Sequence, residues 1–167
     1  PFNEGMGQFQ SKEITHWTMK YDPTRLVNGI SGWQDRGVGH FIDLHQYPGP
    51  GMEPPSQNEG RAVVLGEFGG YGLPVKNHMW DQSKKNWGYR VSETLESYIK
   101  DYNEVIYNLH GEISRGLAAA IYTQTSDVEI EVNGILTYDR KVIKLPIEAT
   151  KTIHDKLFDD YKKAEFI

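Results

Sequence analysis

The segment RAVVLGEFGG, from Arg61 to Gly70, contains the clearest strand in the sequence. Its run of alanine, valine and leucine is typical of a strand that is buried on both faces of a sheet. The run ends in a carboxylate, Glu67, which two glycines follow closely. Functional sites of parallel α/β folds lie at the carboxyl ends of the strands. Glu67 is therefore a candidate site residue.

Apolar patterns on both sides of this segment predict further elements. We expect strands at 26–31, 41–45, 61–67 and 117–122, the last buried on both faces, and helices at 11–20, 92–113 and 147–157. Ser92 would cap the second helix. Asn133-Gly134 is a type I′ turn signal, which predicts a hairpin within 128–138. The order of these elements favours an α/β fold with a parallel sheet.

The composition argues against several classes of protein. The chain has 167 residues, enough for one domain with its own core. It carries 18 Lys and Arg against 23 Asp and Glu, a net charge of −5, which argues against a nucleic-acid partner. No apolar run approaches the roughly 18 residues of a membrane span, so we expect no membrane partner. The absence of cysteine excludes disulfides, thiolate metal sites and cysteine nucleophiles.

The glycine and aromatic content is typical of ligand-binding loops. There are 17 Gly, 10 Tyr and 4 Trp. Aromatic rings can cover the apolar faces of sugars, so the composition suits a carbohydrate site, although an aromatic core would give the same numbers. Trp80 and Trp87 lie on the long loop after Glu67. They would either stack on a sugar or pin that loop by burial.

A second carboxylate, Glu4, follows the short segment Pro1-Phe2-Asn3, which resembles the tail of a strand entering a loop. In a parallel sheet Glu4 and Glu67 would share one rim and could face each other. Two carboxyl groups about 5 Å apart are the arrangement of a retaining glycosidase, with one acid/base and one nucleophile. The amide of Asn3 would then hold a sugar hydroxyl.

The strand at 41–45 adds polar candidates to the same rim. Asp43 and His45 share one face of it because they are two residues apart, and Tyr47 follows its end. His45 and Tyr47 would bind the substrate or the nucleophile. The alternative is a satisfied polar pair beneath the rim.

Metal and cofactor signals are weak. Of six histidines, no pair has the i, i+4 spacing of a helical zinc motif. The sequence also lacks a phosphate-binding loop, a G-x-S-x-G elbow and a complete dinucleotide fingerprint. Asp127, Glu129 and Glu131 could clamp a cation or sugar hydroxyls, or form a solvated acidic face. We therefore expect neither a catalytic metal nor a cofactor.

Five motifs in order resemble the catalytic barrel of glycoside hydrolase family 2, the β-galactosidase, β-glucuronidase and β-mannosidase group. The resemblance is to the β-galactosidase type and covers nearly the whole chain. The motifs are Pro1-Phe2-Asn3-Glu4-Gly5, Asp43-Leu44-His45-Gln46-Tyr47-Pro48, Leu65-Gly66-Glu67-Phe68-Gly69-Gly70, Tyr122-Thr123-Gln124-Thr125-Ser126-Asp127-Val128-Glu129 and Glu131-Val132-Asn133-Gly134-Ile135-Leu136-Thr137-Tyr138-Asp139-Arg140.

The resemblance implies a (β/α)₈ (TIM) barrel that cleaves terminal β-glycosidic bonds. Glu4 would be the acid/base after strand four, Glu67 the nucleophile at the end of strand seven, and Asn3 the substrate-holding amide beside the acid/base. The four predicted strands would then be strands five to eight. The partner would be a β-glycoside, and the lack of a Lys or Arg cluster favours a neutral sugar.

The chain departs from the family in its extent. A full barrel takes about 250 residues. We therefore expect residues 1–167 to form a single truncated domain, the C-terminal half of a barrel, with little activity alone. A second copy would cover its open side, and a bacterial parent protein, periplasmic or extracellular, is compatible with the sequence. The alternative is a non-catalytic carbohydrate-binding or interaction domain, in which Glu4 and Glu67 would lie far apart.

Overall fold

The computed structural model describes residues 1–5, 7–53 and 60–163. Three helices and three strands, α1, α2, α3, β3, β4 and β7, lie where the sequence predicts them, whereas the strand expected at 26–31 is only two residues long. The elements are β1 (Phe2–Asn3), α1 (Ser11–Tyr21), β2 (Ile30–Ser31), β3 (Phe41–Gln46), β4 (Ala62–Gly69), β5 (Tyr71–Gly72), β6 (Arg90–Val91), α2 (Leu95–Ser114), β7 (Leu117–Thr123) and α3 (Ile147–Lys163).

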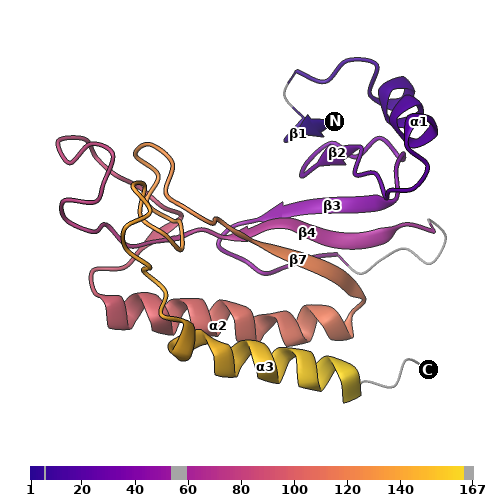
Figure 1. The fold of residues 1–167 in the computed structure, drawn as a ribbon. Coiled ribbons are helices and arrows are strands. Elements are labelled where there is room, and N and C mark those ends of the chain that lie inside the picture. Colours follow the sequence, from indigo (N-terminus) through magenta and orange to yellow (C-terminus); the bar gives the residue numbers. More distant parts are fainter. Residues whose placement is uncertain (6, 54–59, 164–167) are drawn as a thin grey trace.

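The named strands pair in parallel throughout. β1 pairs with β2, β3–β4–β7 form a three-stranded sheet, and β5 pairs with β6. In the chain, α1 connects β1 to β2, and α2 lies between β4 and β7, as parallel neighbours require. The result is a mixed α/β structure whose small sheets do not close on themselves (Figure 1).

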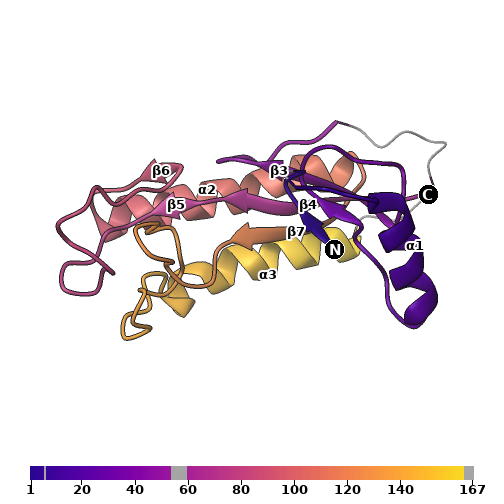
Figure 2. The same ribbon diagram turned by 90° about the horizontal axis from the view of Figure 1, so that it is seen from above.

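The core lies between the three-stranded sheet and two helices. α2 and α3 run side by side beneath β3–β4–β7 (Figures 1 and 2). Most of the apolar side chains of α2 are buried or half-buried in this core, whereas Leu95 at its start is 47% exposed. Each such aliphatic or phenylalanine side chain contributes about 1.5–3 kcal/mol on burial, so the layer gives β4 a firm base. The buried residues include Leu65, Phe68, Tyr98, Tyr102, Val105, Ile106 and Leu109.

The start of α2 differs from the prediction. Thr94 is the cap: its side chain accepts a hydrogen bond from the backbone of Ser97, and the Ser97 side chain accepts one from the backbone of Thr94. The predicted cap, Ser92, is buried and donates to Asp101 over 3.1 Å. Its hydroxyl is used to fix a helix side chain and is not free to cap the helix.

β7 was expected to be buried on both faces, and this prediction is wrong. Leu117 is buried, but Ala118 and Ala119 are exposed, and Ile121 is 63% exposed. Within the described residues β7 pairs along only one edge, with β4. The sheet therefore has an open side next to β7.

The hairpin predicted at Asn133-Gly134 is also wrong. The chain instead turns between Val128 and Glu131, and Leu136 pairs antiparallel with Ile143. Asn133 and Gly134 are buried. A Cβ added to Gly134 would lie 2.1 Å from the backbone nitrogen of Asp127, so this glycine serves a close backbone approach and not a turn.

None of the described helices combines the length and apolar character needed to cross a bilayer.

Candidate active site

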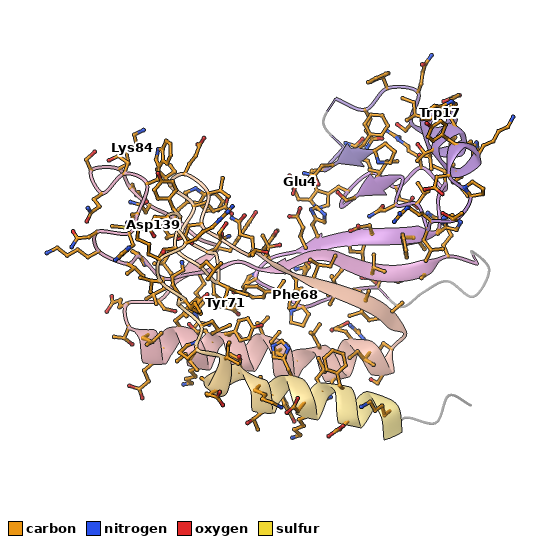
Figure 3. The ribbon with its side chains drawn as sticks, viewed as in Figure 1. Glu4, Trp17, Phe68, Tyr71, Lys84 and Asp139 are labelled. Atoms are coloured by element: carbon orange, nitrogen blue, oxygen red, sulfur yellow. The ribbon has the colours of Figure 1, made fainter. Side chains whose placement is uncertain are left out.

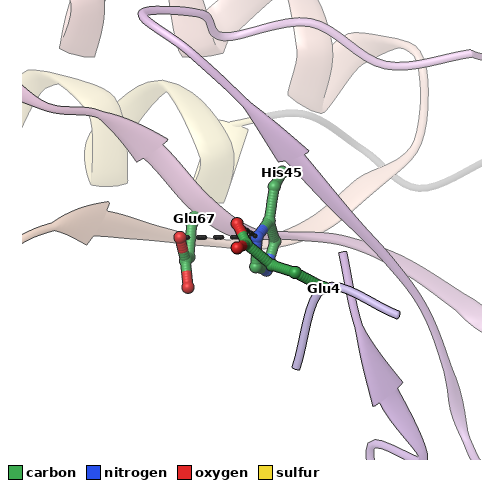
Figure 4. Close-up of side chains that lie close together, drawn as sticks. All are labelled: Glu4, His45 and Glu67. Atoms are coloured by element: carbon green, nitrogen blue, oxygen red, sulfur yellow. Dashed lines mark hydrogen bonds and ion pairs between the residues drawn. The ribbon is translucent and has the colours of Figure 1, made fainter. Parts of the chain in front are cut away.

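The ends of β1, β3 and β4 bring Glu4, His45 and Glu67 together (Figure 4), and Figure 3 shows Glu4 over the sheet that contains β3 and β4. Glu4 follows β1, and its backbone N–H donates to the carbonyl oxygen of Ser31 in β2 over 2.8 Å. His45 in β3 is paired in register with Glu67 in β4. The expected meeting of the two glutamates at one rim is thus present.

The contacts within this group are short. The Nδ1 atom of His45 lies 3.0 Å from Oε1 of Glu4 and 3.4 Å from Oε2 of Glu67. One potential ligand atom from each of the three residues lies within 4.8 Å of the other two. The carboxylate side chains are 33% and 31% exposed, whereas that of His45 is 0% exposed. The two carboxylates therefore face solvent above a buried imidazole.

Glu4 has an unusual backbone conformation. Its φ is 53°, in the left-handed region that residues other than glycine seldom adopt, and Gly5 follows with φ 74°. Non-glycine residues in this region are enriched at functional sites. The conformation turns the chain sharply at the end of β1, next to the carboxylate.

Tyr47 holds the second carboxylate. Its hydroxyl donates to Oε2 of Glu67 over 2.5 Å, and its ring stacks on that of Tyr89 with 3.7 Å between centroids. Burial, and then the nearby Glu67 carboxylate, raise the pKa of Tyr47, so the phenol keeps its proton and acts as a donor. Tyr47, predicted to bind substrate or nucleophile, contacts the predicted nucleophile.

Asp43 lies beneath the group. It is buried and accepts hydrogen bonds from the backbone N–H groups of Gly32 (3.3 Å) and Gly66 (3.1 Å) and from the amide of Asn28. Its Oδ1 atom lies 3.7 Å from Nε2 of His45. Burial raises the pKa of Asp43, and the hydrogen bond from Asn28 opposes this effect.

Two glycines make room for this buried pair. A Cβ at Gly66 would lie 2.2 Å from Oδ1 of Asp43, and a Cβ at Gly32 would lie 2.8 Å from Nδ1 of His45. Any larger residue at either position would displace a polar group below the carboxylates. Gly66, inside the strand motif Leu65-Gly66-Glu67, therefore indicates that a polar side chain, that of Asp43, lies against it on the neighbouring strand.

The remaining predicted residues lie at different distances from the carboxylates. Asn3 precedes Glu4, and its Oδ1 accepts from the Ser31 hydroxyl over 2.6 Å. Trp87 packs edge-on against Tyr89, 5.5 Å between centroids, and so joins the Tyr47–Tyr89 stack. Trp80 packs edge-on against Tyr138, 4.9 Å between centroids. Trp87 is therefore connected to the carboxylate group through rings, whereas the described ring contact of Trp80 is with Tyr138, on the loop after β7.

Of two further residues near the carboxylates, Trp33 was not selected from the sequence, whereas Glu131 was considered as a clamp. The exposed Trp33 lies with its ring 6.4 Å from that of His45. The sequence feature that could have identified Trp33 is its position just after the predicted strand at 26–31. Glu131, left open as a clamp or a solvated residue, is half-buried. Burial raises its pKa, a hydrogen bond from Asn133 opposes this, and Glu67 raises it further.

Asp127 does not belong to a solvated acidic face. It is buried, and its Oδ1 accepts hydrogen bonds from Nζ of Lys144 over 2.6 Å and from the backbone N–H of Gly134 over 2.8 Å. Nζ of Lys144 also donates to the carbonyl oxygens of Val132 (2.9 Å) and Leu73 (3.2 Å), so it joins the segment before Gly134 to the loop after β5. Glu129, in contrast, is exposed.

The arrangement can supply a proton donor and a carboxylate nucleophile to adjoining atoms of one bound molecule, or three ligand atoms to one cation. Among the described residues, Glu4, His45 and Glu67 are the group whose His, Asp or Glu atoms converge in this way. Neither a comparison with protein-family models nor one with curated protein sequences finds a match to this chain.

Proposed function

We propose that this chain supplies both catalytic carboxylates of a retaining β-glycosidase of the β-galactosidase type. The observation that carries the proposal is the convergence of Glu4 and Glu67, which offer oxygens within 4.8 Å of each other. Retaining glycosidases hold their two carboxyl groups about 5–5.5 Å apart, whereas inverting enzymes need about 6.5–9.5 Å to admit a water. The short separation supports double displacement and disfavours the non-catalytic alternative.

Glu4 is the acid/base in this proposal and Glu67 the nucleophile. Glu4 gives its proton to the glycosidic oxygen while Glu67 attacks the anomeric carbon, and the aglycone leaves as an alcohol. Glu4 then takes a proton from water, which attacks the glycosyl ester and releases Glu67. The sequence resemblance implies the same two roles.

The hydrogen bond from Tyr47 supports the role of Glu67. A phenol donating over 2.5 Å fixes the orientation of the carboxylate before attack. The stack on Tyr89 in turn fixes the phenol ring. The carboxylate of Glu4, in contrast, contacts His45. A third of the Glu4 side chain is exposed, which an acid that must reach the leaving oxygen requires.

The sugar would be held by groups around the pair. Asn3 would hold a hydroxyl next to Glu4, and the exposed ring of Trp87, beside Tyr89, would stack on a sugar face. The described part of the site presents carboxylates and aromatic rings, which suits a neutral glycoside.

The strand order supports a partial (β/α)₈ barrel. β1 pairs in parallel with β2, and β3, β4 and β7 form a parallel sheet; Glu4 follows β1, and Glu67 lies near the carboxyl end of β4. The exposed side chains of β7 would then face the first half of the barrel, or a second copy of this chain.

The test uses the complete glycosidase of which, in this proposal, the chain is a part. Glu67→Gln should abolish turnover of an aryl β-galactoside. Glu4→Ala should slow poor leaving groups strongly, spare activated ones and recover with added azide, giving a β-glycosyl azide. Wild-type rates in both variants on every substrate would refute the role assignment.

A further inference from the structure

His45 lies between carboxylates on both sides of its ring. Nδ1 faces Glu4 at 3.0 Å and Glu67 at 3.4 Å, and Nε2 faces Asp43 at 3.7 Å. The side chain is 0% exposed, and Nε2 has no hydrogen-bond partner. A wholly buried, incompletely paired imidazole is thus aimed at two carboxylates that solvent can reach.

The two tautomers of His45 present different atoms to the carboxylates around it. A neutral imidazole carries one N–H. If it is on Nδ1, the lone pair of Nε2 faces the buried carboxylate of Asp43. If it is on Nε2 and both glutamates are ionised, the lone pair of Nδ1 and the oxygens of Glu4 and Glu67 converge. In the second case three electron pairs point at one position.

The spacing of these three atoms suits a small metal ion. Zinc binds histidine nitrogen and carboxylate oxygen at about 2.0–2.2 Å, which places neighbouring ligands of a tetrahedral site about 3.3–3.6 Å apart. The observed edges are 3.0 Å and 3.4 Å, and the third is within 4.8 Å. Rotation of an exposed carboxylate closes the third edge, and the fourth position faces solvent.

Asp43 provides the outer contact that such a site needs. A metal-bound histidine usually directs its other N–H to a carboxylate, which fixes the tautomer and the ring. Two backbone N–H groups and the amide of Asn28 fix Asp43 in this position. With Nε2 protonated toward Asp43, Nδ1 is free to bind the ion.

We propose that Glu4, His45 and Glu67 bind one divalent transition-metal ion of the zinc class, with water in the fourth position. An imidazole nitrogen among the donors favours such ions over magnesium, which prefers oxygen ligands alone. The ion would occupy both carboxylates assigned to glycoside cleavage, so metal and glycoside exclude each other. That consequence rests on the proposed function, and it makes the metal an inhibitor.

The test is a cobalt(II) titration of the 167-residue chain followed by visible absorption, with zinc(II) in calorimetry. We expect one ion per chain and the intense band of a four-coordinate site. His45→Ala should weaken binding at least a hundredfold, and Asp43→Asn about tenfold. His78→Ala is the matched control because His78 also contacts a carboxylate, that of Asp139, at 2.9 Å. It should bind as the wild type does.

Glu67→Gln, which keeps the shape of the side chain, covers the case in which His45→Ala does not fold. Absence of stoichiometric cobalt binding, wild-type binding by folded His45→Ala or Glu67→Gln, or magnesium binding as tightly as zinc would each overturn the inference. No substrate enters the measurement. An active glycosidase without metal binding therefore refutes this inference alone, and metal binding without turnover refutes only the proposed function.

Discussion

Replacing Lys144 by methionine tests the buried ion pair that joins two loops. The side chains of Lys144 and Asp127 are each 1% exposed. Methionine has a similar shape but leaves the carboxylate of Asp127 buried, with the N–H of Gly134 as its described donor and Oδ2 unpaired. Breaking a buried pair in this way costs about 3–5 kcal/mol. Since a domain has about 5–15 kcal/mol of stability in all, the loss is a large part of it.

The measurement is urea unfolding of the 167-residue chain followed by circular dichroism. Lys141→Met is the control, because that side chain is 75% exposed and lies 4.0 Å from Asp139. It should change the free energy of unfolding by less than about 0.5 kcal/mol. Adding Asp127→Asn to Lys144→Met removes the buried charge and should restore at least about 2 kcal/mol. A Lys144→Met chain within about 1 kcal/mol of the wild type would refute the reasoning.

Three further predictions follow from the contacts described above. In the complete protein, Tyr47→Phe should lower kcat for aryl β-galactosides about tenfold or more and change KM little, because Glu67 loses the donor that orients it; an unchanged kcat would contradict this. Gly134→Ala should destabilise the chain by more than about 3 kcal/mol in urea, because its Cβ would lie 2.1 Å from backbone; wild-type stability would contradict it. The hydrogen bond from Thr137, together with that from His78, lowers the pKa of Asp139 to about 2 from 3.8. Stability from this group is therefore lost as pH falls from 3.8 to about 2, so the Tm of Asp139→Asn should fall less steeply there than that of the wild type.

The sequence predicts best where one physical rule decides the outcome. The long helix is predicted from its apolar pattern, and most of these apolar side chains pack into the core beneath the sheet. The carboxyl ends of parallel strands meet at one rim, so Glu4 and Glu67 converge although more than sixty positions separate them. Both predictions needed only periodicity and the direction of the strands.

The predictions fail where the outcome depends on a distant neighbour. Glycine after asparagine suggests a turn, but Gly134 is needed because another backbone segment passes within reach of its Cβ position. The small apolar residues of β7 indicate burial only if a strand lies on each side. Lys144 gives no local sign of burial, since its partner Asp127 is 17 positions away. Ser92 and Thr94 are both good caps, and the contact of Ser92 with Asp101 decides between them.

Gly66 has a consequence for how related chains can vary. Unlike Gly32, whose φ is 80°, it is not among the residues with positive φ, so its own backbone does not require glycine. What forbids a side chain there is the carboxylate of Asp43, 2.2 Å from where a Cβ would lie. The two positions should therefore covary: lineages that shorten residue 43 become free to accept alanine at 66, and those that retain the aspartate do not.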